Sequence, residues 1–266
     1  MPKSSAIASS TTGWSFTASA STAKAEPGLT PVQRLRIAAR VAGCLALFAV
    51  IGPAQLVVSA LGRRDVLPPP FLAAIGWLCG LRVSVRGSPA AAPVLLLANH
   101  VSWLDILGLA GASRSAFAGK DALAVHPFLR WLCEQNDTIF LQRDHRQTVA
   151  QQVAAMRAAL ARRPLTLFPE GTTSDGRALL PFKSSLLAAA EGTGVTVQPV
   201  ALDYADAAEI AWGQEPGLRN IWAILARRRP VRLTIRFLNP LPEAMLGDRK
   251  ALAPAAQRAI TEALPL

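Results

Sequence analysis

The stretch Val94-Leu95-Leu96-Leu97-Ala98-Asn99-His100-Val101-Ser102-Trp103-Leu104-Asp105 decides the fold of this chain. Its first five residues are all apolar, which is typical of a strand that is buried on both faces of a sheet. Polar residues follow immediately, in the segment 99–105. The stretch therefore predicts an α/β domain in which a chemically active loop follows a central strand.

A second apolar run, residues 165–168, predicts another buried strand, which ends at Pro169-Glu170-Gly171-Thr172. Between the two runs, apolar residues recur from 149 to 160 at spacings of four, three and four, the pattern of an amphipathic helix. Residues 195–200 and 231–237 predict two more strands, and the alternating pattern of the latter indicates an edge strand. We expect an α/β fold with a central mixed sheet flanked by helices.

The loop after the first strand places Asp105 five residues after His100. On a tight turn that enters a helix, the carboxylate can accept one ring N–H and leave the other nitrogen free to take a proton. The pair lacks a nucleophile, so the substrate has to supply the hydroxyl. By itself the spacing is equally typical of a hydrogen-bonded structural histidine at a strand end.

H-x-x-x-x-D after one strand and Phe168-Pro169-Glu170-Gly171-Thr172 after another resemble the lysophosphatidate (1-acyl-glycerol-3-phosphate) acyltransferase family of glycerolipid acyltransferases. Residues 139–143 and 197–201 resemble two further blocks of that family, in the expected order. The resemblance covers roughly residues 92 to 202. It implies O-acylation of a lysophospholipid, with acyl-CoA or acyl-carrier protein as donor substrate and without a cofactor.

The resemblance also implies a role for each matching residue. His100 would be the general base and Asp105 its orienting partner, while Arg143, Glu170 and Gly171 would form the acceptor site. An Arg binds phosphate through two hydrogen bonds, and a Gly lets backbone amides approach an anion. We expect Glu170 to accept a glycerol hydroxyl or to hold Arg143.

Three further residues are candidates for substrate binding. Thr172 either contributes to the acceptor site or caps the turn that follows it. Lys183 departs from the family pattern, in which a Gly follows the Lys closely, and a solvated surface role explains it as well. The resemblance places Lys120 at the entrance of the site.

The N-terminal third divides into two parts. Residues 1–29 are rich in small and polar residues and are expected to be a disordered tail. Residues 30–82 are expected to associate with the membrane, because residues 41–62 carry no charge and would span about 33 Å as a helix. Pro53 should kink this helix, and arginines flank it on both sides, so we favour a hairpin in one leaflet over a true span. Residues 83–266 form the expected catalytic domain.

Composition limits the partners. The chain has 266 residues, 51% of them hydrophobic and 17% charged, with a formal net charge of +11, which favours anionic membrane lipids. We find no nucleic-acid-binding motif and expect no nucleic-acid partner. Three cysteines without C-x-x-C spacing indicate a reducing compartment, and no cluster has metal-ligand spacing, so we expect no metal site.

The function expected from the sequence is acylation of lysophosphatidate to phosphatidate at the inner (cytoplasmic) membrane, with the catalytic domain facing the cytoplasm. A lyso-amino-acid lipid such as lyso-ornithine lipid is the alternative acceptor. A catalytically inactive membrane protein that binds lipid is the alternative from another class.

Overall fold

The computed structural model describes residues 28–120, 127–141, 148–213 and 217–265. The predicted tail lies outside these residues except for its last two positions. The helices are α1 (Pro31–Ala60), α2 (Pro68–Leu78), α3 (Leu104–Ser113), α4 (Pro127–Gln135), α5 (Thr148–Leu160), α6 (Ala207–Ile210), α7 (Gly217–Ala226) and α8 (Arg249–Ala263). The strands are β1 (Leu81–Arg86), β2 (Val94–Ala98), β3 (Ala116–Lys120), β4 (Ile139–Leu141), β5 (Leu165–Leu167), β6 (Thr196–Tyr204) and β7 (Val231–Phe237).

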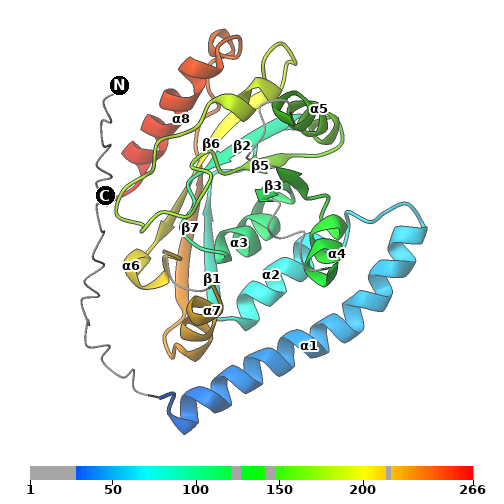
Figure 1. Cartoon of the computed structure of the whole chain (residues 1–266), viewed down its shortest axis with the longest axis vertical. Helices are drawn as coiled ribbons and strands as arrows, with labels where there is room; N and C mark the ends of the chain where they lie inside the picture. The colour runs from blue at the N-terminus through cyan, green and yellow to red at the C-terminus, as the bar shows by residue number, and fades with distance from the viewer. Residues whose placement is uncertain (1–27, 121–126, 142–147, 214–216, 266) are drawn as a thin grey trace, which may run out of the picture.

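The seven strands form one mixed sheet in the order β1-β7-β6-β2-β5-β3-β4 (Figure 1). All neighbours are parallel except β6 and β7. This confirms the predicted fold class. The prediction that residues 231–237 form an edge strand is wrong, because β1 pairs with the outer side of β7 and becomes the edge. The alternation in β7 arises because Arg232, Thr234 and Arg236 share the less covered face of the sheet.

The core has two layers, one on each face of the sheet. Side chains alternate along β2, so Leu96 faces a cluster that includes residues of α3 and α7. Leu95 and Leu97 face the opposite cluster, which includes residues of α5 and α8. Every residue of β2 is fully buried, as the apolar run predicts.

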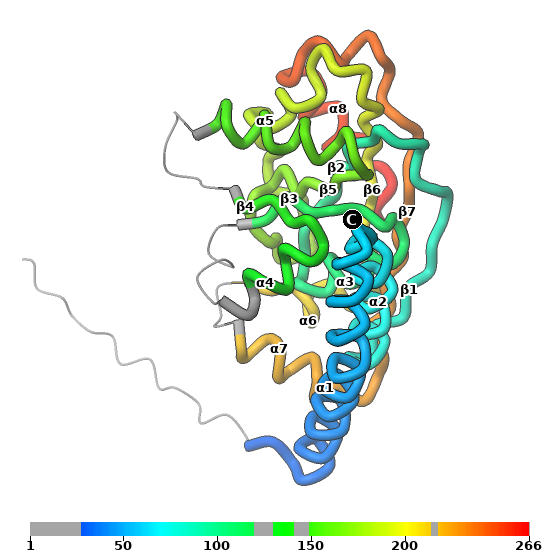
Figure 2. Tube along the Cα trace, turned by 90° about the vertical axis from the view of Figure 1, so that its right-hand side faces the viewer, coloured from blue at the N-terminus to red at the C-terminus, as the bar shows by residue number. Residues whose placement is uncertain are grey.

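The N-terminal helix α1 lies along the outside of the domain, beside α2 and α7 (Figure 2). It begins at a capping box, in which Thr30 Oγ1 accepts the amide of Gln33 and Gln33 Oε1 accepts the amide of Thr30. Pro53 lies inside the helix without ending it. By length and composition α1 is the single helix in the described part of the chain that is long and apolar enough to cross a membrane.

Two arginines of α1 donate hydrogen bonds to the catalytic domain. Arg36 Nη1 donates to the carbonyl oxygen of Ala226, and Arg40 Nη1 donates to those of Ile224 and Leu225. These carbonyls belong to the last turn of α7, where the helix dipole favours positive charge. The N-terminal segment is therefore attached to the domain through α7 as well as through α2.

The register of β2 with β5 and β6 determines where the functional loops meet. Leu97 lies opposite Leu167 of β5 and Pro199 of β6, and all three strands run in the same direction. Their carboxyl ends therefore lie at one edge of the sheet. At this edge Asn99 Nδ2 donates to the Leu202 carbonyl oxygen at 3.0 Å, and Asn99 Oδ1 accepts the Leu202 amide at 2.7 Å.

Replacing Asn99 with Ala should leave two buried backbone groups of Leu202 without partners. We expect the free energy of unfolding to fall by about 2 kcal/mol or more. Urea unfolding of the detergent-solubilised protein measures this. The control is Thr261→Ala, which removes an exposed hydroxyl that bonds only within its own helix. Equal stabilities of the two variants would contradict the role of Asn99.

Candidate active site

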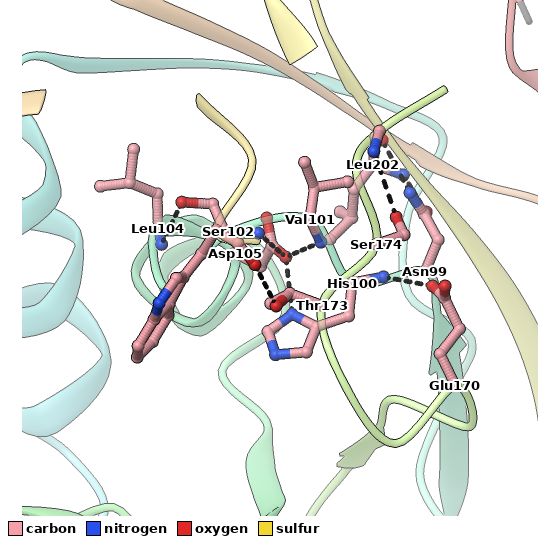
Figure 3. A network of polar contacts seen from close by, with 12 residues as sticks. Asn99, His100, Val101, Ser102, Leu104, Asp105, Glu170, Thr173, Ser174 and Leu202 are labelled. Carbon is pink, nitrogen blue, oxygen red and sulfur yellow. Dashed lines mark hydrogen bonds and ion pairs between the residues drawn. The ribbon is translucent and has the colours of Figure 1, made fainter. Parts of the chain in front are cut away.

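The loops after β2 and β5 meet at His100. The backbone amide of His100 donates to Glu170 Oε1 at 2.7 Å, and the Ser174 amide donates to the carbonyl oxygen of His100 at 2.7 Å. Figure 3 shows the contact between the His100 amide and Glu170. Segments that are about seventy residues apart in the sequence are thus joined at one point.

His100 and Asp105 form the predicted pair. His100 Nδ1 lies 2.8 Å from Asp105 Oδ2. The same carboxylate oxygen accepts the amides of Val101 at 2.7 Å and Ser102 at 3.0 Å, so the loop is wrapped around it. Asp105 is fully buried in the first turn of α3. Because an ionised carboxylate only accepts hydrogen bonds, Nδ1 carries the proton and Nε2 is left to accept one.

The other oxygen of Asp105 binds a residue that we did not predict. Tyr204, the last residue of β6, donates its hydroxyl to Asp105 Oδ1 at 2.6 Å. No motif in the sequence identifies Tyr204, because its approach to Asp105 depends on the pairing of β6 with β2. A retrospective signal is that Tyr204 is the only tyrosine in the chain.

The His100 ring is held on one side and open on another. It stacks on the Phe168 ring, with centroids 4.1 Å apart and planes 18° apart. Its side chain is 19% exposed and lines a cavity of about 650 Å³. Among the described residues, Nε2 has no hydrogen-bond partner. The ring therefore presents a proton acceptor to whatever occupies the cavity.

The cavity has a mostly apolar wall with a few polar groups. Its apolar lining includes Trp103, Ile106, Phe117, Val149, Leu167, Phe168, Leu186 and Trp212. Its polar lining includes Thr138, Gln152, Thr172, Thr173, Lys183 and Ser185. Such a surface suits a long apolar group together with one polar end.

Glu170 is buried next to the backbone of His100 and is 2% exposed. Besides the His100 amide on Oε1, it accepts the Leu180 amide on Oε2 at 2.8 Å. Its contacts therefore hold the backbone at His100 and Leu180. The expected contact with a glycerol hydroxyl or with Arg143 stays a prediction, because Arg143 lies outside the described residues. Burial raises the pKa of Glu170 above its usual range, and the two amide donors partly oppose this.

The remaining predicted residues divide into three groups. Thr172 and the exposed Lys183 line the cavity, as does Gly171, whose φ of 75° is in the region that favours glycine. Lys120 is the last residue of β3, next to Gly119 of the cavity wall. Arg143 lies outside the described residues.

No group of His, Cys, Asp and Glu in the described parts of the chain could hold a metal ion. The arrangement can remove a proton from a hydroxyl that enters the cavity and can stabilise the imidazolium that results.

Comparison with known proteins gives a consistent result. The family described as Acyltransferase matches residues 82–203. A lyso-ornithine lipid O-acyltransferase of Pseudomonas aeruginosa is 35% identical over 251 residues, which cover 87% of this chain and 94% of that protein. A 1-acyl-sn-glycerol-3-phosphate acyltransferase of Neisseria meningitidis is 33% identical over 175 residues, covering 63% of this chain and 68% of that protein.

A solved structure shares the fold. The crystal structure of the 1-acyl-sn-glycerophosphate acyltransferase of Thermotoga maritima superposes with a TM-score of 0.66 at 19% sequence identity. The match covers 87% of this chain and 95% of the other. The N-terminal helices are therefore part of a shared architecture and not an addition to it.

The raised pKa of Glu170 gives a pH-dependent contribution to stability. Between the ordinary pKa of about 4.3 and the raised one, the folded protein binds more protons at this residue than the unfolded chain. The free energy of unfolding should therefore fall, relative to that of Glu170→Gln, as the pH rises through this interval. Chemical unfolding of both proteins from pH 4 to pH 8 measures the difference. If the wild-type free energy of unfolding instead rises relative to that of Glu170→Gln as the pH increases, the raised pKa of Glu170 is contradicted.

Proposed function

The chain belongs to the acyltransferase family, and from this premise we propose that it transfers a fatty acyl group from acyl-CoA or acyl-carrier protein to the free hydroxyl of a lysolipid. The observation that supports this best is the His100–Asp105 pair at the wall of a largely apolar cavity. The imidazole provides the base, and the apolar lining provides room for acyl chains.

In the proposed reaction, His100 Nε2 removes the proton of the acceptor hydroxyl while its oxygen attacks the thioester carbonyl. The new ester bond forms, the carbon–sulfur bond breaks, and the proton passes to the leaving thiolate. Asp105 stabilises the imidazolium in between. The transfer is direct, so we expect sequential kinetics and no covalent acyl-enzyme.

Two acceptors are supported by different observations. Lysophosphatidate is supported by the Neisseria relative and by the solved structure with the same fold. Lyso-ornithine lipid is supported by the Pseudomonas relative, whose similarity extends over nearly its whole length. A panel of both acceptors with labelled acyl-CoA, each assayed with purified protein, distinguishes them by kcat/KM.

Membrane association follows from the exposed apolar surface of α1, on which Leu35, Leu45, Val50 and Leu56 are each more than half exposed. We propose that the protein acts at the inner membrane with its catalytic domain in the cytoplasm, where acyl thioesters are available. Flotation with vesicles of anionic phospholipid tests the association directly.

His100→Ala should lower kcat by about 100-fold or more, because a positioned general base contributes that much. The measurement is steady-state acylation of the preferred acceptor, with circular dichroism to show that the variant is folded. The control is Lys250→Met, a change at an exposed residue near the start of α8. Turnover within a few-fold of wild type would overturn the proposed role.

Lys183→Met tests the acceptor from the protein side. If a phosphate binds near this cavity residue, loss of the ammonium should raise the KM for lysophosphatidate about 10-fold and leave kcat nearly unchanged. The KM for acyl-CoA measured alongside shows whether the effect belongs to the acceptor. An unchanged KM for lysophosphatidate would place its phosphate elsewhere.

A further inference from the structure

Tyr204 lies outside the cavity but forms a hydrogen bond with Asp105. It does not line the cavity that holds His100, but it lies at the end of β6 and is 6% exposed. Its hydroxyl oxygen is 2.6 Å from Asp105 Oδ1. The contacts of Asp105 with His100, Val101 and Ser102 all reach Oδ2.

The direction of this hydrogen bond is determined by chemistry. Burial raises the pKa of Tyr204 well above its usual range, and the neighbouring carboxylate of Asp105 raises it further. The phenol therefore keeps its proton and donates it to the carboxylate. A carboxylate that is held at both oxygens from two different elements cannot rotate about its Cβ–Cγ bond without breaking one set of contacts.

We propose that Tyr204 is a positioning residue of the acyl transfer, which holds the Asp105 carboxylate so that Oδ2 faces His100 Nδ1. This inference rests on the proposed function and extends it to a chain of three residues, Tyr204, Asp105 and His100. Three donors from the loop between β2 and α3 bind Oδ2, and Tyr204 supplies a donor to Oδ1 from the end of β6.

The same contact adjusts the charge that His100 meets. A hydrogen bond from Tyr204 draws part of the carboxylate charge away from the imidazolium. Among the described residues, the other ionisable groups at this site are Glu170, on the His100 backbone amide, and Lys183 and Cys133, in the cavity wall. None of them contacts Tyr204, so a change in the pH profile can be assigned to Asp105.

The test is Tyr204→Phe, which removes one oxygen atom and retains the ring. We expect kcat to fall about 10-fold or more, the size of a hydrogen bond to a charged group. The KM for the lysolipid should stay within about two-fold, because Tyr204 does not contact the cavity. The acid limb of the kcat–pH profile should move to higher pH, since the unshared carboxylate favours the protonated imidazole.

The matched control is Thr166→Val. It also removes one buried hydroxyl, which lies 2.6 Å from Ser115 Oγ, while Asp105 and His100 are untouched. Both variants should lose similar stability, but Thr166→Val should keep the wild-type pH profile. If both variants change kcat and its profile alike, Tyr204 acts only through stability and the proposal is overturned.

A double-mutant cycle with Asp105→Asn tests whether Tyr204 acts through the carboxylate. In the Asp105→Asn background, Tyr204→Phe should lower kcat by less than two-fold. A full additional 10-fold loss would show that Tyr204 acts by another route and would overturn the proposal.

An absorbance titration tests the contact without any substrate. Because Tyr204 is the only tyrosine, tyrosinate absorbance reports this residue alone. We expect none until the protein unfolds in alkali, whereas ionisation of the folded protein near the ordinary value of about 10 would refute the hydrogen bond. Absence of acylation by the wild-type protein would instead refute the proposed function and leave this result standing.

Discussion

A buried carboxylate needs hydrogen-bond donors around it, and this requirement organises the loop between β2 and α3. Removing an ion from water costs several kcal/mol unless its oxygens are satisfied. Asp105 is fully buried and accepts four hydrogen bonds, including one from the His100 ring and one from Tyr204. The turn of the backbone, the direction of the imidazole and the position of the end of β6 are therefore three consequences of one charge.

The parts of this arrangement that are local in sequence are predictable. The apolar run of β2 predicts its burial, and the five-residue spacing predicts that Asp105 can reach the ring of His100. Contacts that depend on strand order are not predictable in this way. Tyr204 reaches Asp105 because β6 lies beside β2, and β7 is internal because β1 pairs with it. Residues 81–86 carry only a short alternating pattern, so nothing in them indicates that they pair with the outer edge of β7.

Glu170 shows that recognising a motif does not predict all the contacts of its residues. The resemblance implies a place for its carboxylate in the acceptor site, which stays a prediction, and the fold adds that both oxygens accept backbone amides, at His100 and Leu180. The two buried carboxylates thus act on one histidine from opposite sides, Asp105 on the ring and Glu170 on the backbone (Figure 3). The contact with Leu180 cannot be predicted from its residue type, because every residue except proline offers a backbone amide.

The groups that hold His100 are separate from the side chains of the cavity wall, and this separation allows one site to be adapted to either proposed acceptor. A hydroxyl and a thioester are common to the proposed reactions on both candidate lysolipids, so the role that we propose for His100, Asp105 and Tyr204 is the same in each. Discrimination requires groups that touch the remainder of the acceptor. In the described part of the chain these are the residues of the cavity wall, where Lys183 lies among apolar and hydroxyl side chains. Acceptor choice can therefore change by substitution in this wall while the buried hydrogen bonds that position the proposed base, His100, remain unaltered.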